Sequence, residues 1–202
     1  MTSPGIAAAT GLATGLGLIV AIGAQNAYVL RQGVRREHVL PIVAICALSD
    51  AALIIAGVAG MGGLVQAAPG LLTVIRWVGA AFLLVYGLMA ARRAMNPERL
   101  ETGAATAPTS LRTAVLTTLA FTWLNPHVYL DTIVFLGSVA TSQGAHRWWF
   151  AAGAATASVL WFTGLGYGAR LLAPLFAKPR AWRILDALIA VVMITLAITL
   201  VR

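Results

Sequence analysis

The sequence predicts an all-α membrane protein with six transmembrane helices. Of its 202 residues, 60% are apolar and only 10% are charged, whereas about 25% are charged in a typical soluble protein. The mean hydropathy is +0.88, and so few charged side chains do not cover the surface of a soluble domain of this size. A hydrocarbon core needs about 20 helical residues to cross it. Six apolar runs approach or exceed this length, at 6–30, 39–64, 71–91, 113–141, 148–169 and 184–201.

Basic residues between these runs predict the orientation. The loops after the first, third and fifth runs carry most of the 14 Lys and Arg. By the positive-inside rule these loops face the cytoplasm, so both termini face outward. The basic residues concerned are Arg31, Arg35, Arg36, Arg92, Arg93, Arg99, Arg112, Arg170, Lys178, Arg180 and Arg183.

The longest polar connection, 92–112, divides one transmembrane domain (1–202) into two three-helix halves, 1–91 and 113–202. Because three is an odd number, the halves must insert with opposite orientation. This is typical of inverted-topology repeats, which place a transport site between the halves near the membrane midplane. The sequence echo is faint, "QNAYVL" against "NPHVYL", and two unrelated bundles remain the alternative.

Charge and cysteine content exclude other classes of protein. The net charge of +8 lies in loop clusters and not along one amphipathic face, so we expect no nucleic-acid binding. Cys46 is the only cysteine, which excludes a disulfide scaffold and makes it a small packed side chain. The opening "MTSPGIAAAT" lacks the basic region of a signal peptide, so the first run is expected to be a helix of the mature protein. We expect neither a cofactor nor a metal.

Two acidic residues fall inside apolar runs. Asp50 is eleven residues into the second run, about 16 Å along a helix and so close to the bilayer centre. A charge there costs on the order of 3 kcal/mol. Asp131 lies in the second half of the fourth run, and His127 precedes it by one helical turn, on the same face. Both carboxylates must therefore face protein or water.

Two further signals indicate interrupted helices. Pro126 removes a backbone donor and leaves a carbonyl group unpaired, and Asn125 suits the non-helical conformation that precedes proline. A helix that restarts there offers N–H groups to an anion. In the first run, Gln25 and Asn26 follow a glycine-rich approach and lie deep in the membrane. Together these residues predict a polar cavity at the midplane.

Structural roles without a cavity remain open for several residues. Asp50 could pair with Arg76, His127 could be a packing residue, and Pro126 could mark a simple kink. Four other residues have an expected structural role. Gly164 and Gly168 are expected to be helix-packing contacts, Trp161 a packing residue, and Asp186 the interfacial ion-pair partner of Arg183.

Three motifs carry a family resemblance: "GAQNAYVLRQGVRR", "CALSDAALI" and "TWLNPHVYLDT". They resemble the bacterial lysine exporter family, and within it the arginine-exporting branch, over essentially the whole chain. The resemblance implies a multi-pass carrier in the bacterial cytoplasmic membrane that expels arginine and lysine. The residues that match the family motifs are Gln25, Asn26, Asp50, Asn125, Pro126, His127, Tyr129 and Asp131.

This resemblance suggests a mechanism. The side-chain cation of the substrate would pair with Asp50, Asp131 or both, and its carboxylate would meet backbone N–H groups near Asn125, with Gln25 and Asn26 completing the polar shell. Moving a cation out of a negative interior costs about 2.3 kcal/mol per 100 mV, so export requires coupling. Burial disfavours a charged carboxyl group, so the two aspartates could hold protons when the cation is absent. A homo-oligomer remains open.

Two alternatives compete with this interpretation. The chain could carry a neutral amino acid or a metal cation. It could also be an intramembrane aspartyl protease, which needs two membrane aspartates that share a proton. Such proteases resemble one another in a Gly-x-Gly-Asp motif, whereas Asp50 follows "ALS" and Asp131 follows "VYL".

Overall fold

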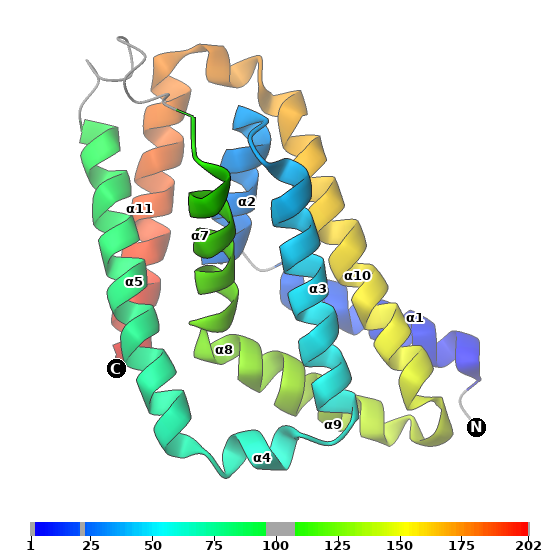
Figure 1. The fold of residues 1–202 in the computed structure, drawn as a ribbon. Helices are drawn as coiled ribbons and strands as arrows, with labels where there is room; N and C mark the ends of the chain where they lie inside the picture. Colours follow the sequence, from blue (N-terminus) through cyan, green and yellow to red (C-terminus); the bar gives the residue numbers. More distant parts are fainter. Residues whose placement is uncertain (1–2, 21–22, 96–107, 202) are drawn as a thin grey trace.

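Every element that the computed structural model describes is helical, which confirms the all-α part of the predicted fold class (Figure 1). The description covers residues 3–20, 23–95 and 108–201. The linker predicted at 92–112 thus lies mostly outside it. The helices are α1 (Pro4–Ile19), α2 (Ala24–Arg35), α3 (Val39–Val58), α4 (Gly62–Gln66), α5 (Pro69–Met95), α7 (Leu111–Trp123), α8 (Pro126–Val128), the π-helix η2 (Tyr129–Phe135), α9 (Leu136–Ser142), α10 (Arg147–Gly168) and α11 (Pro179–Val201), with 3₁₀ turns η3 (Gly144–His146), η4 (Ala169–Leu172) and η5 (Leu175–Ala177).

Helices α3, α5 and α11 are each long and apolar enough to cross a membrane, and α1 with α2 makes a fourth span if this bent pair counts as one. Leucine, valine and tryptophan side chains along the outer face of α5 are exposed, including Leu71, Val74, Trp77 and Val85. An apolar exterior of this kind suits contact with lipid. The chain therefore has the helices of a membrane protein, and the count of six spans remains a prediction.

The first predicted span is not one continuous helix. Helix α1 ends at Ile19, Gly23 has an extended backbone, and α2 then runs to Arg35. The two segments are inclined by 84°, and Figure 1 shows α1 lying across the lower half of α10. Gly11 lets α1 approach this closely, because a β-carbon there would overlap the carbonyl oxygen of Phe150.

The fourth predicted span is interrupted where its proline predicts. Helix α7 ends at Trp123, Asn125 is extended (φ −102°, ψ 108°), and a new helix begins at Pro126. The new helix runs through the π-helical segment η2, which the sequence did not predict, before α9 completes it. Each half of the chain thus begins with a broken helix and continues with two long ones, α3 and α5 or α10 and α11.

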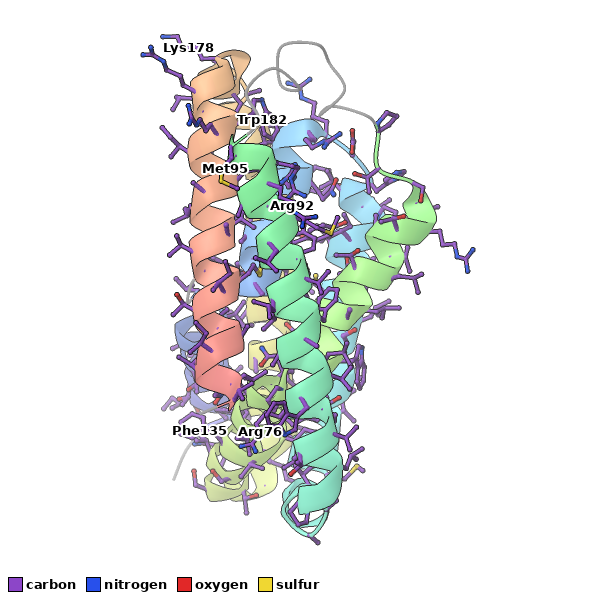
Figure 2. The ribbon with its side chains drawn as sticks, turned by 90° about the vertical axis from the view of Figure 1, so that its left-hand side faces the viewer. Arg76, Arg92, Met95, Phe135, Lys178 and Trp182 are labelled. Atoms are coloured by element: carbon purple, nitrogen blue, oxygen red, sulfur yellow. The ribbon has the colours of Figure 1, made fainter. Side chains whose placement is uncertain are left out.

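The basic clusters gather at one end of the bundle. The C-terminal ends of α2, α5 and α10 and the N-terminal ends of α7 and α11 all lie at the upper end in Figure 1. Figure 2 shows Arg92 and Lys178 toward this end, and Arg76 toward the other. Helix α1 begins and α11 ends away from the basic end. Which side of the membrane the basic end faces remains a prediction.

A small polar clamp fixes the start of α7 at the basic end. Glu37 accepts hydrogen bonds from the backbone N–H of Thr109 (3.1 Å) and from Arg35 (3.0 Å). The His38 ring lies 2.7 Å from the Thr109 carbonyl oxygen. Burial by itself raises the pKa of Glu37, but the hydrogen bonds from Thr109 and Arg35 outweigh burial and lower the pKa below its ordinary value.

Two glycines in the fifth predicted span do not have the expected role. Gly164 and Gly168 of α10 were expected to be packing contacts, yet a β-carbon at either position would meet no atom within 4 Å. Gly166, between them, is the packed residue, because its β-carbon would lie 2.9 Å from Val43. A helix turns about 100° per residue, so a glycine motif alone does not say which of its members faces a neighbouring helix.

Candidate functional site

A cavity of about 280 Å³ lies where the two broken helices meet. Six of the eight predicted site residues line it, and they come from three separate parts of the chain: Gln25, Asn26, Asp50, Asn125, His127 and Asp131. The rest of the wall is largely apolar and includes Phe82, Phe121 and Phe162. The structure thus brings both aspartates and three amide side chains to one cavity, as the buried polar residues predicted.

Asp50 faces this cavity from the middle of α3. Its Oδ2 atom accepts a hydrogen bond of 2.6 Å from the hydroxyl group of Ser158 on α10. Among the described residues it forms no ion pair with Arg76. Arg76 instead lines a separate groove next to the second helix break. The alternative in which Asp50 is a structural partner of Arg76 is therefore wrong.

Asn26 holds the first helix break together. Its side-chain amide donates to the carbonyl oxygen of Ile19 (2.7 Å), at the end of α1, and its Oδ1 accepts from the indole N–H of Trp161 (3.2 Å). The amide thus satisfies a carbonyl group that the break would leave unpaired. Trp161 was expected only to pack, and the structure gives it this polar contact as well.

Gln25 has an unpaired donor. The side-chain nitrogen of Gln25 is buried and has no oxygen or nitrogen acceptor, and its neighbour is the Cys46 thiol, a weak acceptor. A buried unpaired N–H group costs about 1–3 kcal/mol. Since Gln25 lines the cavity, a ligand with an acceptor group would recover this cost.

The second helix break does not offer the free backbone donors that its sequence suggested. The N–H of His127 donates to Oδ1 of Asn125 (3.1 Å), and the N–H of Val128 donates to the Asn125 carbonyl oxygen (3.2 Å). Pro126 has no N–H. Asn125 therefore caps the new helix with its own side chain, and the expectation of an open anion site at this helix start is not met.

Two of the eight predicted site residues, Pro126 and Tyr129, do not line the cavity. Pro126 is buried at the start of α8 and lines the groove with Arg76. The Tyr129 hydroxyl donates to the Trp123 carbonyl oxygen across the break (2.8 Å), and the Trp123 indole N–H donates to Ser49 of α3 (3.2 Å). These contacts brace the broken helix against α3.

Asp131 and His127 are exposed side chains on the cavity wall. Asp131 belongs to the π-helix η2, a type of helical turn often found at functional sites. Within the described part of the chain, no hydrogen bond joins Asp131 to Asp50. The Oδ2 atom of Asp50 instead accepts the hydrogen bond from Ser158. The aspartates therefore do not form the proton-sharing pair that an aspartyl protease requires.

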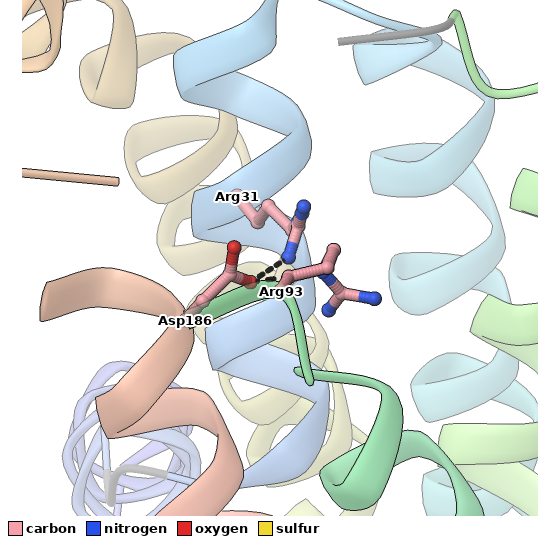
Figure 3. Close-up of polar contacts among 3 residues, drawn as sticks. All are labelled: Arg31, Arg93 and Asp186. Carbon is pink, nitrogen blue, oxygen red and sulfur yellow. Dashed lines mark hydrogen bonds and ion pairs between the residues drawn. The ribbon is translucent and has the colours of Figure 1, made fainter. Parts of the chain in front are cut away.

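The ion-pair partner predicted for Asp186 is wrong. Asp186 was expected to pair with Arg183 one turn away, but its side chain is buried and bonds to Arg31 of α2 and to Arg93 of α5 (3.2 Å), as Figure 3 shows. Arg31, counted above as a loop residue, is buried within α2. These three residues are called the Asp186 cluster below.

Ser158 was not singled out from the sequence. Its only signal was a hydroxyl group in an apolar run, one turn before Trp161. Because both residues turn out to bond to the predicted site, a polar stripe on α10 could have been proposed from their spacing.

Comparison with known proteins identifies the family of this chain. The family model described as "LysE type translocator" matches residues 16–202. The chain is 54% identical to a "Putative amino-acid transporter" of Mycobacterium tuberculosis over 90% of each chain. It is 45% identical to the "Arginine exporter protein ArgO" of Salmonella enteritidis, over 95% of this chain and 92% of the relative. No solved structure matches it. The chain therefore belongs to the family of LysE type translocators.

Proposed function

We propose that this protein exports basic amino acids, arginine or lysine, across the cytoplasmic membrane of a bacterium in exchange for protons. As a family member the chain is a transporter and not an enzyme, which excludes the intramembrane protease. Relatives named as an arginine exporter and as amino-acid transporters support the substrate class. The observation that carries the proposal is the cavity that Asp50 and Asp131 line together.

The cavity suits one basic amino acid in size and in charge. Its volume of about 280 Å³ is close to the lower end of ligand pockets, about 300–1,000 Å³. A guanidinium group donates in a fork that matches a carboxylate, so Asp50 and Asp131 are the partners for the substrate side chain. A neutral amino acid leaves both carboxylates without a counter-charge, which disfavours its binding.

The substrate carboxylate needs donors, and Gln25 provides the best one. Its buried side-chain nitrogen has no oxygen or nitrogen acceptor, whereas the first backbone N–H groups of the restarted helix are already bonded to Asn125. Binding at Gln25 displaces at most a contact with the Cys46 thiol, which is a weak acceptor. Asn26 fixes the backbone next to Gln25 through its bond to Ile19 and acts as a positioning residue.

Proton exchange provides the driving force. Expelling a cation from a negative interior costs about 2.3 kcal/mol per 100 mV before any concentration gradient. One proton carried inward per exported cation makes the exchange electrically neutral. With a second proton, one positive charge moves inward per cycle, so the membrane potential also drives export. In this scheme Asp50 and Asp131 bind protons when the substrate cation has left. The two broken helices at the cavity support alternating access between inverted halves.

Efflux from proteoliposomes tests this function. Vesicles loaded with labelled arginine should lose it through the wild-type protein, and faster when the outside is acidic. Asp50→Asn and Asp131→Asn should each abolish efflux without loss of protein from the membrane. Glu37→Gln, the same carboxylate-to-amide change outside the cavity, is the matched control and should retain efflux.

Competition by lysine, threonine and divalent cations then defines the substrate. Lysine should compete with labelled arginine, and the other solutes should not. Normal arginine efflux from either aspartate variant would contradict the mechanism. Stronger competition by threonine than by lysine would reassign the carrier to neutral amino acids.

A further inference from the structure

The cavity ends partway through the bundle. Helix α2 lines it only with residues 24–26 at its N-terminal end, α5 only with residues 79–83, and α11 only near its C-terminal end, with Leu196 and Leu200. Helix α11 packs against both α5 and α2, and closer to the basic end the ring of Tyr28 on α2 lies 6.0 Å from that of Tyr86 on α5. The cavity is therefore closed on the side of the basic end.

Four aromatic rings form the first closing layer. Phe121 has its ring centroid 5.0 Å from that of Phe82, 5.1 Å from that of Tyr86 and 5.4 Å from that of Tyr28. Phe82 and Phe121 line the cavity, and Tyr28 is 3% exposed behind them. These rings, the aromatic layer, come from α2, α5 and α7, and their tilted and edge-to-face arrangement is the one that aromatic groups prefer.

The Asp186 cluster lies directly behind the aromatic layer. Arg31 is one turn beyond Tyr28 on α2, and the Arg93 guanidinium lies 5.8 Å from the Tyr86 ring centroid. The Asp186 and Arg31 side chains are 2% and 7% exposed. Figure 3 shows the three side chains converging from α2, α5 and α11, so a single carboxylate holds three helices together.

On its opposite side the cavity adjoins the separate groove that Arg76 lines. This groove of about 300 Å³ shares two lining residues, His127 and Leu200, with the cavity. This groove lies at the lower part of α5, away from the basic end (Figure 2). The cavity thus adjoins this groove on one side and an ionic and aromatic barrier on the other.

We propose that the aromatic layer and the Asp186 cluster are the gate of the transporter toward the basic end, which the positive-inside rule assigns to the cytoplasm. The proposal rests on the proposed function, because a carrier must open its cavity to that side to load substrate. Gln25, Asp50 and Asp131 would bind the substrate, whereas Asp186, Arg31 and Arg93 would hold the closed state.

The chemistry of the cluster suits a barrier that opens. In a buried ion pair, the attraction between the charges roughly offsets their loss of hydration. Separating Asp186 from its two arginines into water therefore costs little net free energy, because the three charged groups regain their hydration as they lose their mutual attraction. Removing the carboxylate alone leaves two buried arginines without a counter-charge, which favours the separated, hydrated state.

Thiol labelling from each side of the membrane tests the gate. Cys46 is the only cysteine, so Cys46→Ala gives a cysteine-free background, and Ala120→Cys places a reporter on the cavity wall. A charged, membrane-impermeant methanethiosulfonate reagent should label this reference protein in spheroplasts and leave it nearly unlabelled in inside-out vesicles. Adding Asp186→Asn should raise the labelling rate in inside-out vesicles at least tenfold.

Two matched variants separate gating from general loosening. Arg183→Gln removes a charge from the same helix, next to Asp186, and should leave the labelling rate within twofold of the reference. Asp186→Glu keeps the carboxylate and should label more slowly than Asp186→Asn. If Asp186→Asn does not accumulate, Arg31→Gln leaves Arg93 on the carboxylate and should raise labelling several-fold.

The outcome separates the gate from the proposed substrate. Labelling of Asp186→Asn and Arg31→Gln at the reference rate on both sides would overturn the gate, and so would rapid labelling of the reference protein in inside-out vesicles. Failure of the wild-type protein to move arginine would contradict the proposed function and leave this labelling result unchanged, because labelling measures access of the reagent and not transport.

Discussion

Replacing Gly79 by alanine should destabilise the second helix break and show how closely it is packed. Gly79 of α5 faces Leu124, the residue between α7 and Asn125, and a β-carbon on Gly79 would overlap the Leu124 carbonyl oxygen. Backbone at a proline break yields less easily than a side chain. Gly79→Ala must therefore push α5 away from the break or shift the cavity wall, since both residues line the cavity.

The size of the effect follows from two opposing terms. Overpacking costs about 1–3 kcal/mol, and the change from glycine to alanine inside a helix recovers about 0.5–1 kcal/mol. The difference is about 0–2.5 kcal/mol, and the overlap with backbone at Gly79 places it in the upper part, at about 1–2.5 kcal/mol, or a fall in Tm of about 2–10 °C for a chain of this size. Gly164→Ala is the matched control, because it meets no atom within 4 Å and should raise the Tm slightly.

The chain carries its own reporter for this measurement. Cys46 is the only cysteine and is 0% exposed, so a fluorogenic maleimide reacts with it only as the protein unfolds in detergent. Gly79→Ala should release the signal at a lower temperature than wild type and should also lower arginine efflux. A Tm for Gly79→Ala equal to that of Gly164→Ala would refute the close approach of Gly79 and Leu124.

Two further changes test polar contacts. Asn26→Ala leaves the Ile19 carbonyl group and the Trp161 indole N–H without their amide partner, which costs about 1–3 kcal/mol for each unpaired group. The same thiol assay should therefore show a Tm at least about 4 °C lower. An unchanged Tm would show that the first break does not depend on this amide. Glu37→Gln should lower the Tm at pH 7 and lower it less at about pH 3.5. The hydrogen bond from Thr109 lowers the pKa of Glu37, so its carboxylate stabilises the fold above the ordinary pKa of 4.5, and this effect is lost as pH falls through the lowered folded pKa. A Tm difference that is the same at both pH values would contradict this assignment.

The two helix breaks differ in how well the sequence predicts them. Pro126 lacks a donor and restrains the residue before it, so a local rule placed the second break correctly. The first break falls at Gly23, and glycine permits many conformations without requiring one. Its position is fixed by contacts that are distant in sequence, such as the bond from Trp161 to Asn26.

The sequence predicts those parts of the candidate site that follow from the free-energy cost of placing polar groups in lipid. A carboxylate or amide in an apolar helix must face protein or water, and this reasoning brought Asp50, Asp131 and Gln25 to one cavity. The ion-pair partner of a buried carboxylate, in contrast, cannot be read from the residues near it in sequence. Asp186 takes Arg31, 155 residues away, in preference to Arg183 one turn away, because helix packing decides which arginine reaches a buried carboxylate.

The brace across the second break joins the surroundings of the two cavity aspartates mechanically. Tyr129, two residues before Asp131, is bonded to Trp123, and the rigid indole of Trp123 is bonded to Ser49, the neighbour of Asp50. Flat aromatic side chains transmit a push with little bending of their own. A tilt of the helix segment that carries Asp131 therefore reaches, through two hydrogen bonds, the residue next to Asp50.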